Sequence, residues 1–267
     1  MATKTYEISD SQWRVIKDML PPERTGKPGR PCETSNRDVL NGVLWIAHTG
    51  SQWKELPAEY GKKSTLFGRF KGWKDKGILE SIFLELSKDC DMQDLSLDST
   101  SSKVHQHAAG AKRGPDEKEV TADEMKKKQD IGLSRGGNNT KIHALVDGLG
   151  NPIRLLFTSG EASDCNWGVP LLQGFPLSES SVLGDKAYGT VEILAYIREN
   201  GGTVVIPPKS NTVNPWDCDY HHYKERHLVE CFFNKLKHFR RIATRYEKLS
   251  TMFQAFVYLA AVMIWLM

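Results

Sequence analysis

The apolar residues of this chain change their spacing near residue 90, and this change constrains the fold more than any other feature. Before residue 90 they recur every three or four positions, as Trp13, Ile16 and Leu20 do. After it they alternate with polar residues, as in the segment 94–98. A period of 3.6 residues is typical of a helix with one buried face, and a period of two is typical of a strand. We therefore expect an all-helical region over 1–90 and an α/β region over 91–267.

Signals for helix starts and ends divide the first region into several short helices. Serine residues that can cap a helix precede helical spacing at three places: Ser9, Ser35 and Ser64. A fourth helix is expected over 78–89, and Gly50 is expected to end the second. Short helices joined by tight turns are typical of helix-turn-helix domains, so the spacing predicts a small DNA-binding domain.

Two basic segments of this region are candidate DNA contacts. The segment 62–76 contains six basic residues and one acid, and its Arg69, Lys71 and Lys74 would lie near phosphates if it is a recognition helix. The alternative is an ordinary solvated helix face. Arg30, between glycine and proline in the segment 26–31, could enter a minor groove, although such clusters are more often simple turns.

The second region has the elements of a mixed sheet flanked by helices. Short runs typical of strands are bounded by turn residues at 94–98, 141–146, 153–157, 181–184 and 203–206. A helix is expected over 190–199, and the chain is expected to be helical again from Tyr220. This order of elements predicts a mixed α/β sheet.

The distribution of charge is uneven, although the total is only +3. The net charge is +3 over 1–90, −5 over 91–220 and +5 over 221–267. A protein that holds cations in one place and a polyanion nearby shows such a division, but the pattern alone assigns no function.

Cysteine usage and the apolar stretches favour a cytoplasmic protein without membrane contact. The five cysteines are widely spaced and form no CxxC pair, which disfavours a disulfide framework and a zinc ribbon. The first ten residues lack the apolar core of a signal peptide. The apolar stretch 252–267 is shorter than the ~20 residues of a membrane span, so we expect a buried helix there.

Two aspartates follow predicted strands and are candidate metal ligands. Asp98 ends the first strand and Asp185 follows the fourth. Sites in open α/β sheets collect at the carboxyl ends of strands, and paired carboxylates suit Mg²⁺ or Mn²⁺. A single aspartate after a strand is more often a turn residue or a helix cap, so a third acid is needed.

The expected helix over 220–249 supplies a third acid, Glu230. If the helix is continuous, Glu230 shares one face with basic and aromatic residues, and the apolar residues lie opposite. The shared face comprises Tyr223, Arg226, Glu230, Lys237 and Arg241. The residues alone leave two interpretations open. They are surface ion pairs, or a metal-binding glutamate beside cations that hold phosphates.

The spacing of Tyr223, Arg226, Glu230 and Lys237 resembles the Y-R-E-K signature of bacterial DDE transposases. Nearly the whole chain is similar to the insertion-sequence-5 family. The similar segments are GRP at 29–31, HTGSQWKELPAEYG at 48–61, LSLDSTSSKVHQHAAGAKRG at 95–114, SRGGNNTKIHALVDGLGNP at 134–152, VLGDKAYG at 182–189, YKERHLVECFFNKLKHFRRIATRYEKL at 223–249 and LAAVMIWL at 259–266. Family members often have VER where this chain has Val229-Glu230-Cys231.

The resemblance implies an RNase H-like catalytic domain in which Asp98, Asp185 and Glu230 bind two Mg²⁺ or Mn²⁺ ions. It implies a transposase that binds the terminal inverted repeats of an insertion sequence, cuts the element ends and joins the 3′-hydroxyl ends to target DNA. Arg226 and Lys237 would hold phosphates beside Tyr223, on a homodimer or higher oligomer. Two alternatives stay open: a nuclease without strand transfer, and a DNA-binding repressor without catalysis.

The roles of several other polar or aromatic residues are less constrained by the sequence. Arg135 and Lys141, near Gly136-Gly137, could contact DNA phosphates or flank an exposed turn. Trp216 could stack on an unpaired base, although packing is the better interpretation. The histidines at 105, 107, 221 and 222, and Cys218, could bind zinc, but oxygen ligands are favoured at the metal site and a second ligand pair is missing.

Overall fold

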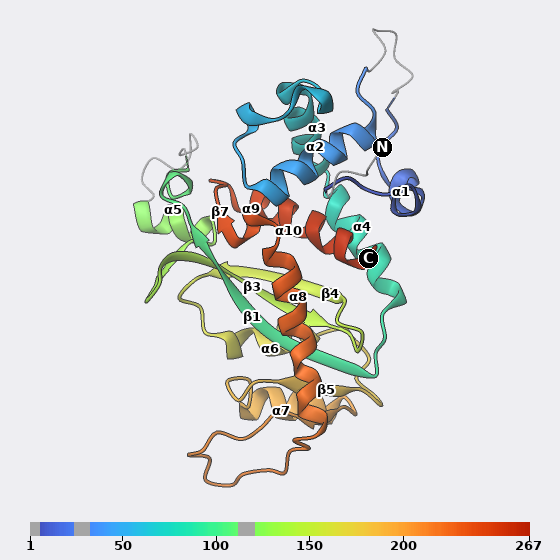
Figure 1. Ribbon diagram of the computed structural model, residues 1–267. Helices are drawn as coiled ribbons and strands as arrows, with labels where there is room; N and C mark the ends of the chain where they lie inside the picture. The colour runs from blue at the N-terminus through green and yellow to red at the C-terminus, as the bar shows by residue number, and fades with distance from the viewer. Residues whose placement is uncertain (1–5, 24–32, 112–120) are drawn as a thin grey trace.

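The computed structural model describes residues 6–23, 33–111 and 121–267 and contains a helical region above a mixed sheet (Figure 1). The helices are α1 (Asp10–Ile16), α2 (Asn36–Thr49), α3 (Lys63–Asp75), α4 (Ile78–Leu86), α5 (Ala122–Lys128), α6 (Gly168–Leu172), α7 (Val191–Glu199), α8 (His227–Lys237), α9 (Arg240–Ala243) and α10 (Ser250–Trp265). The strands are β1 (Asp94–Val104), β2 (Gly132–Ser134), β3 (Gly137–Val146), β4 (Pro152–Ser159), β5 (Ser181–Gly184), β6 (Thr203–Val205) and β7 (Thr244–Arg245). Short 3-10 turns are η1 (Lys17–Met19), η2 (Trp53–Glu55), η3 (Ala58–Tyr60), η4 (Ser87–Asp89), η5 (Gln106–Ala108), η7 (Asp164–Trp167) and η8 (His222–Arg226).

The N-terminal helices form where their capping residues predict. Ser9 and Ser35 each accept a hydrogen bond from the third residue of the following helix, and that residue's side chain accepts one in return. Gly50 ends α2 with φ of 71°, a conformation that favours glycine. The third helix differs slightly, because Lys62 rather than Ser64 is its N-cap. Within residues 6–23 and 33–90 the structure contains helices and turns without strands, so the prediction is confirmed for the described part of this region.

The strands form one mixed sheet, as the sequence predicts. Its main path is β2-β3-β1-β5-β6, with β4 paired to β3. The central strand β1 is antiparallel to β3 and parallel to β5. The α/β fold class is therefore confirmed, although the short strands β2 and β7 give too little alternation to be recognised from sequence.

Helices cover both faces of the sheet, and each face has its own apolar core. Alternate residues of β3 divide between the two cores: Ile142 and Ala144 pack with α8 and α10, whereas Leu145 packs with α6 and α7. This division follows from the alternation of side chains along a strand. In Figure 1, α8 crosses β1 on one face of the sheet.

The N-terminal helices do not have a separate apolar core. Val43 of α2 and Phe70 of α3 belong to the same buried cluster as Phe256 of α10, and the Phe70 and Phe256 ring centroids are 4.7 Å apart. The division of the chain into 1–90 and 91–267 stays a prediction. Apolar packing, however, crosses this boundary.

The prediction of one helix from Tyr220 to residue 249 was wrong. The chain forms the turn η8, the helix α8 to Lys237, the four-residue helix α9 and then the strand β7. At the break, Phe239 has an extended backbone and is 1% exposed, and its ring stacks on His48 of α2 at 3.9 Å. Packing against the N-terminal helices therefore outweighs the local helical preference.

The C-terminal apolar segment forms the buried helix α10, as expected. Its residues Phe253, Phe256 and Leu259 are at most 1% exposed and lie in the core shared with α3 and α4. Across the described ranges, the helices are all too short or too polar to span a membrane.

Candidate active site

Asp98 and Asp185 lie side by side on neighbouring parallel strands. The pairing of β1 with β5 ends at Leu97 and Gly184, which are directly opposite each other. The expectation that Asp98 ends the first strand was wrong, because pairing with β3 carries β1 on to Val104. Asp98 is the residue of β1 after Leu97, and Asp185 directly follows the end of β5, so both aspartates lie at the same level of the sheet. The parallel pairing of β1 with β5 thus brings together the two aspartates that the sequence suggested as metal ligands.

Burial and the neighbouring acid both disfavour ionisation of Asp98. Its side chain is 22% exposed. Burial raises the pKa of Asp98 above its usual value, and the negative charge of Asp185 adds to that effect. The opposing influences are the backbone N–H of Ser99, which donates to Asp98 Oδ1 at 2.7 Å, and the positive charge of Arg226. A carboxylate pair of this kind has residual negative charge that a cation can neutralise.

Asp185 is oriented by the turn that follows β5. Its Oδ1 accepts a hydrogen bond from the backbone N–H of Ala187 at 2.7 Å. The next turn residue, Tyr188, is 1% exposed. Burial first, and then the charges of Asp98, Asp164 and Asp185, raise the pKa of the Tyr188 phenol, so this ring lies close to all three acids.

Arg226 joins the first strand to α8. It lies at the end of η8, and its Nη1 donates to Asp98 Oδ2 at 2.9 Å while its Nη2 contacts Glu230 Oε1. The guanidinium is also 5.9 Å from the ring of Tyr223, whose pKa is raised by burial and by Asp185. The turn η8 is fixed to β1 by His222, whose Nε2 is 2.8 Å from Asp94 Oδ1. Arg226 therefore links Asp98 of β1 to Glu230 of α8, and Asp98 is also close enough to Asp185 for their charges to interact.

The donor set fits a divalent cation, although it is not assembled into a closed metal centre. The part of the chain that the structure describes has no group of three His, Cys, Asp or Glu side chains close enough to hold a metal ion. Between Asp98 and Glu230 lies the guanidinium of Arg226, which contacts both carboxylates. The donors are carboxylate oxygens, which Mg²⁺ and Mn²⁺ prefer.

The remaining residues of the expected α8 face have different positions. Lys237 is seven residues after Glu230 on the same helix, about two turns or 10 Å away, and is partly exposed. Arg241 was expected on this face, but the helix break directs it elsewhere. It is 7% exposed, its Nη1 donates to the Ser51 carbonyl at 2.7 Å, and its Nε donates to Glu247 at 2.5 Å.

The other predicted DNA contacts divide into exposed and engaged side chains. Arg135 is exposed in the turn between β2 and β3. Lys141 is 16% exposed and donates to Asp164, so the structure gives it a partner within the protein. Arg69 donates to the Thr34 carbonyl at 2.6 Å, ahead of α2.

On α3, Lys71 and Lys74 both pair with Asp75, at 2.7 Å and 2.5 Å. Lys71 is about half exposed and Lys74 is 13% exposed, so only Lys71 projects well into solvent. Arg30 lies outside the described residues.

Trp216 is packed within the protein. Its Nε1 donates to the Ile206 carbonyl at 2.7 Å, and its ring lies against the core that contains Leu97 and Ile193. The packing interpretation is confirmed. The zinc alternatives find no support within the described ranges, where the histidines and Cys218 form no three-residue cluster.

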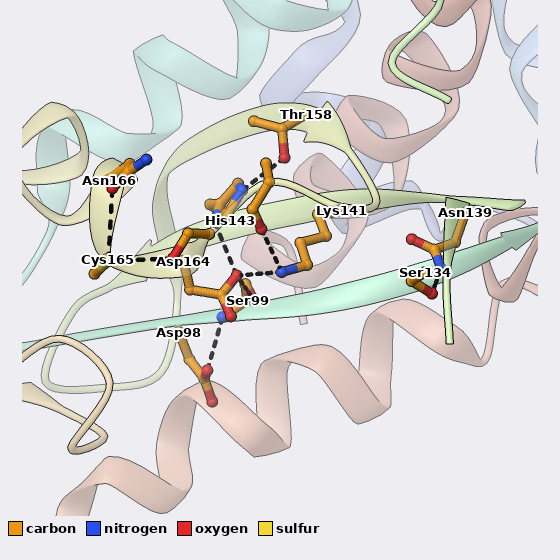
Figure 2. Close-up of polar contacts among 12 residues, drawn as sticks. Asp98, Ser99, Ser134, Asn139, Lys141, His143, Thr158, Asp164, Cys165 and Asn166 are labelled. Carbon is orange, nitrogen blue, oxygen red and sulfur yellow. Dashed lines mark hydrogen bonds and ion pairs between the residues drawn. The ribbon is translucent and has the colours of Figure 1, made fainter. Parts of the chain in front are cut away.

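A polar cluster that the sequence did not predict lies on the side of β1 opposite to the Asp98 side chain (Figure 2). Asp164 at the start of η7 accepts hydrogen bonds from Ser99 and Lys141, and His143 lies beside them. These residues come from three segments that are 21 or more residues apart in the sequence. No spacing rule within a single helix or strand could have revealed the cluster.

Asp98 within β1, Asp185 directly after β5 and Glu230 on a helix across the sheet form an acidic arrangement of the kind that DDE-type phosphoryl-transfer enzymes use. Residues 89–265 match the family described as "Transposase DDE domain". Residues 8–83 match the family described as "Putative transposase of IS4/5 family". The chain belongs to the DDE transposase family and is a DNA transposase.

Two curated relatives carry the names of insertion elements, and each matches less than half of this chain. The "Putative transposase for insertion sequence element IS6501" of Brucella ovis is 43% identical over 130 residues, which are 48% of this chain and 98% of the relative. A 16.2 kDa protein of insertion element IS402 from Burkholderia cepacia is 35% identical over 116 residues, which are 40% of this chain and 78% of the relative.

A solved structure of a piggyBac transposase synaptic complex with hairpin DNA is 11% identical. It aligns with a TM-score of 0.48 over 96% of this chain and 72% of that chain.

Proposed function

We propose that this transposase binds the terminal inverted repeats of its element, hydrolyses the phosphodiester bond at each end, and joins the freed 3′-hydroxyl groups to target DNA. The observation that carries the proposal is the register of β1 and β5, which places Asp98 and Asp185 side by side. Arg226 brings Glu230 of α8 to the same edge. A nuclease that only cuts would use the same three acids, whereas a DNA-binding repressor would not need them.

Asp98, Asp185 and Glu230 would hold two Mg²⁺ or Mn²⁺ ions. When bound, such ions supply charge stabilisation to the attacking and leaving oxygens of an in-line displacement at phosphorus. The protein itself contributes position and charge. The two aspartates are fixed by backbone N–H groups, and α8 holds Glu230 and Lys237 on a rigid element. Lys237 then neutralises a phosphate of the scissile strand about two helical turns from Glu230.

Arg226 has two successive partners in this proposal. Without DNA it neutralises Asp98 and Glu230. When cations take over that neutralisation, the guanidinium is released toward the phosphate of the scissile strand, which accepts the same bidentate geometry as a carboxylate. DNA binding and assembly of the metal site would thus favour each other.

The DNA partner is double-stranded, and a homodimer or higher oligomer would hold two element ends. The exposed side chains of Lys71 on α3 and Arg135 at the β2–β3 turn support a surface that contacts phosphates. The engaged side chains of Arg69, Lys74 and Lys141 have partners inside the protein and contribute to this surface less directly.

Three substitutions test the catalytic assignment: Asp98→Asn, Asp185→Asn and Glu230→Gln. Each should abolish cleavage of a labelled terminal-repeat duplex in Mg²⁺, while gel-shift affinity for that duplex is kept. Near-normal cleavage by any one of them would contradict the triad.

The nuclease alternative is separated by a joining assay. Pre-cut terminal-repeat DNA is incubated with a target plasmid and Mg²⁺, and joined products are expected. Cleavage without joined products would favour a nuclease that only cuts, and sequence-specific binding without either reaction would favour a repressor.

A further inference from the structure

The polar cluster behind Asp98 joins β1, β3 and η7 through the carboxylate of Asp164. Neighbouring residues of a strand point to opposite faces, so Ser99 lies on the face of β1 opposite to Asp98. Ser99 Oγ donates to Asp164 Oδ1 at 2.7 Å, and Lys141 Nζ donates to the same oxygen at 2.9 Å. Lys141 Nζ also donates to the Ala162 carbonyl at 2.6 Å. In Figure 2 these side chains converge on Asp164, and Asp98 projects the other way.

The cluster lies beside a stretch of β1 that is paired on one side only. Pairing of β1 with β5 stops at Leu97, and pairing with β7 begins only at Lys103. Among the described residues, the stretch between these two positions is therefore paired only with β3. Asp98 and Ser99 are the first residues of that stretch, so an extra contact is needed to hold their backbone in place.

The same backbone sets the direction of the Asp98 carboxylate. The N–H of Ser99 donates to Asp98 Oδ1 at 2.7 Å, so a rotation of the peptide at 98–99 would move the carboxylate. The hydroxyl of Ser99 is in turn held by Asp164. The orientation of Asp98 toward Asp185 thus depends on a contact from the opposite face of the sheet.

The surroundings keep Asp164 in one position. The imidazole of His143 is fully buried, with its Nε2 2.9 Å from Thr158 Oγ1 and its Nδ1 3.9 Å from Asp164 Oδ1. The ring of Trp167 stacks on the imidazole, with centroids 5.6 Å apart. A carboxylate held by an ammonium group, a hydroxyl and a packed ring has little freedom to move.

We propose that Asp164, fixed by Lys141, is a positioning residue that acts through Ser99 to aim the Asp98 carboxylate at the metal site. The inference rests on the proposed function, because it assigns Asp98 to that site. A contact that orients a metal ligand in this way changes metal affinity by about 10–100-fold when it is removed. An ion pair that only stabilises the fold would leave metal affinity unchanged.

Ser99→Ala is the cleanest variant, because it removes the link and leaves the Lys141–Asp164 pair intact. Ser99→Thr keeps the hydroxyl and suits a strand, so it should restore the link. Asp164→Asn keeps an oxygen acceptor for Ser99 and loses the charge that holds Lys141. A matched control is Ser250→Ala, since Ser250 makes a serine–carboxylate hydrogen bond to Asp130, between α10 and the segment before β2.

The experiment measures Mn²⁺ binding by electron paramagnetic resonance, using the full chain with and without a terminal-repeat duplex. Ser99→Ala should weaken Mn²⁺ binding about tenfold and raise by a similar factor the Mn²⁺ concentration needed for half-maximal cleavage. Ser99→Thr should recover both values. The Mn²⁺ affinity of Asp164→Asn should lie between those of Ser99→Ala and the wild type. The Mn²⁺ affinity of Ser250→Ala should equal that of the wild type. Duplex affinity in EDTA should be the same for all of them.

The outcomes distinguish this inference from the proposed function. Wild-type Mn²⁺ affinity in Ser99→Ala, or an equal loss in Ser250→Ala, would overturn the positioning role. A wild-type chain whose Mn²⁺ binding depends on Asp98 but which cuts no DNA would overturn the proposed function alone. A chain that binds no Mn²⁺ in either state would overturn both.

Discussion

At the scale of single residues, the two carboxylate contacts of Arg226 give a prediction for metal binding. Its guanidinium contacts Asp98 and Glu230, and charged hydrogen bonds of this kind are worth about 1.5–3 kcal/mol each. Arg226→Gln should therefore tighten Mn²⁺ binding to the DNA-free chain about tenfold, since the ion no longer displaces a cation, while cleavage falls sharply. Isothermal titration calorimetry with Mn²⁺ measures the first effect.

Lys237→Gln is the control for Arg226→Gln. The structure records no ion pair of Lys237 within the described residues, so this change should leave Mn²⁺ affinity unaltered and reduce cleavage by weakening the phosphate contact. If Arg226→Gln needs more metal instead of less, Arg226 orients Glu230 and does not compete with the ion.

His143 gives the protein a pH-dependent stability. Burial lowers the pKa of His143 from 6.5 to about 4, against the opposing effect of Asp164 and with a further lowering by Lys141. As the pH falls, His143 is therefore protonated in the unfolded chain before it is protonated in the folded one. The free energy of unfolding decreases as the pH falls from about 6.5 to about 4. The loss is at most about 3 kcal/mol. Urea unfolding at pH 7.5, 5.5 and 4.5 should show a smaller decrease for His143→Gln than for the wild type.

The free energy of unfolding of the His143→Gln variant is still expected to decrease somewhat as the pH falls. His48, beside Phe239, also has a pKa lowered to about 4 by burial and by His238, and carboxylates titrate at the acid end. An equal decrease in the free energy of unfolding of the wild type and of His143→Gln would show that His143 takes up no proton between pH 7.5 and 4.5.

At the scale of elements, the sequence predicted those helices and strands whose signals are local. The capping boxes at Ser9 and Ser35 and the alternation before Asp98 each lie within a few residues, and the structure has all three. The helix end at Phe239 could not be predicted, because its cause is a ring of α2 that is far away in sequence. The same reason hid Asp164, whose partners Ser99 and Lys141 are brought to it only by the sheet.

A substitution of Phe239 tests whether packing against α2 ends the helix α8. Phe239→Ala removes a ring that is 1% exposed and stacked on His48, and such truncations cost about 3–5 kcal/mol. Phe67→Ala, at a residue 39% exposed on α3, should cost much less. Denaturant unfolding of both variants measures the difference, and similar losses would show that Phe239 is not a buried anchor between α2 and α9.

At the scale of the whole molecule, the shared apolar core links the N-terminal helices to the helices that cover one face of the sheet. Residues of α2, α3 and α4 pack in one cluster with α8 and α10, and Tyr258 of α10 donates to Glu80 of α4 at 3.0 Å. Two independent folding units would each need an apolar core of their own. The protein should therefore recognise DNA and place its active site as one rigid unit.

This shared core predicts one cooperative unfolding transition for the full chain. Far-UV circular dichroism, which follows the helices, and tryptophan fluorescence should give the same urea midpoint, because neither region retains its core after the other unfolds. Residues 1–90 alone would expose the faces of α3 and α4 that pack against Phe256 and Tyr258, so this fragment should be less helical than the same residues are in the full chain. Two separate midpoints, or a stably folded 1–90 fragment, would mean that the N-terminal helices fold independently. The DNA affinity of that fragment would then report on terminal-repeat recognition by itself, with the steep salt dependence expected for phosphate contacts.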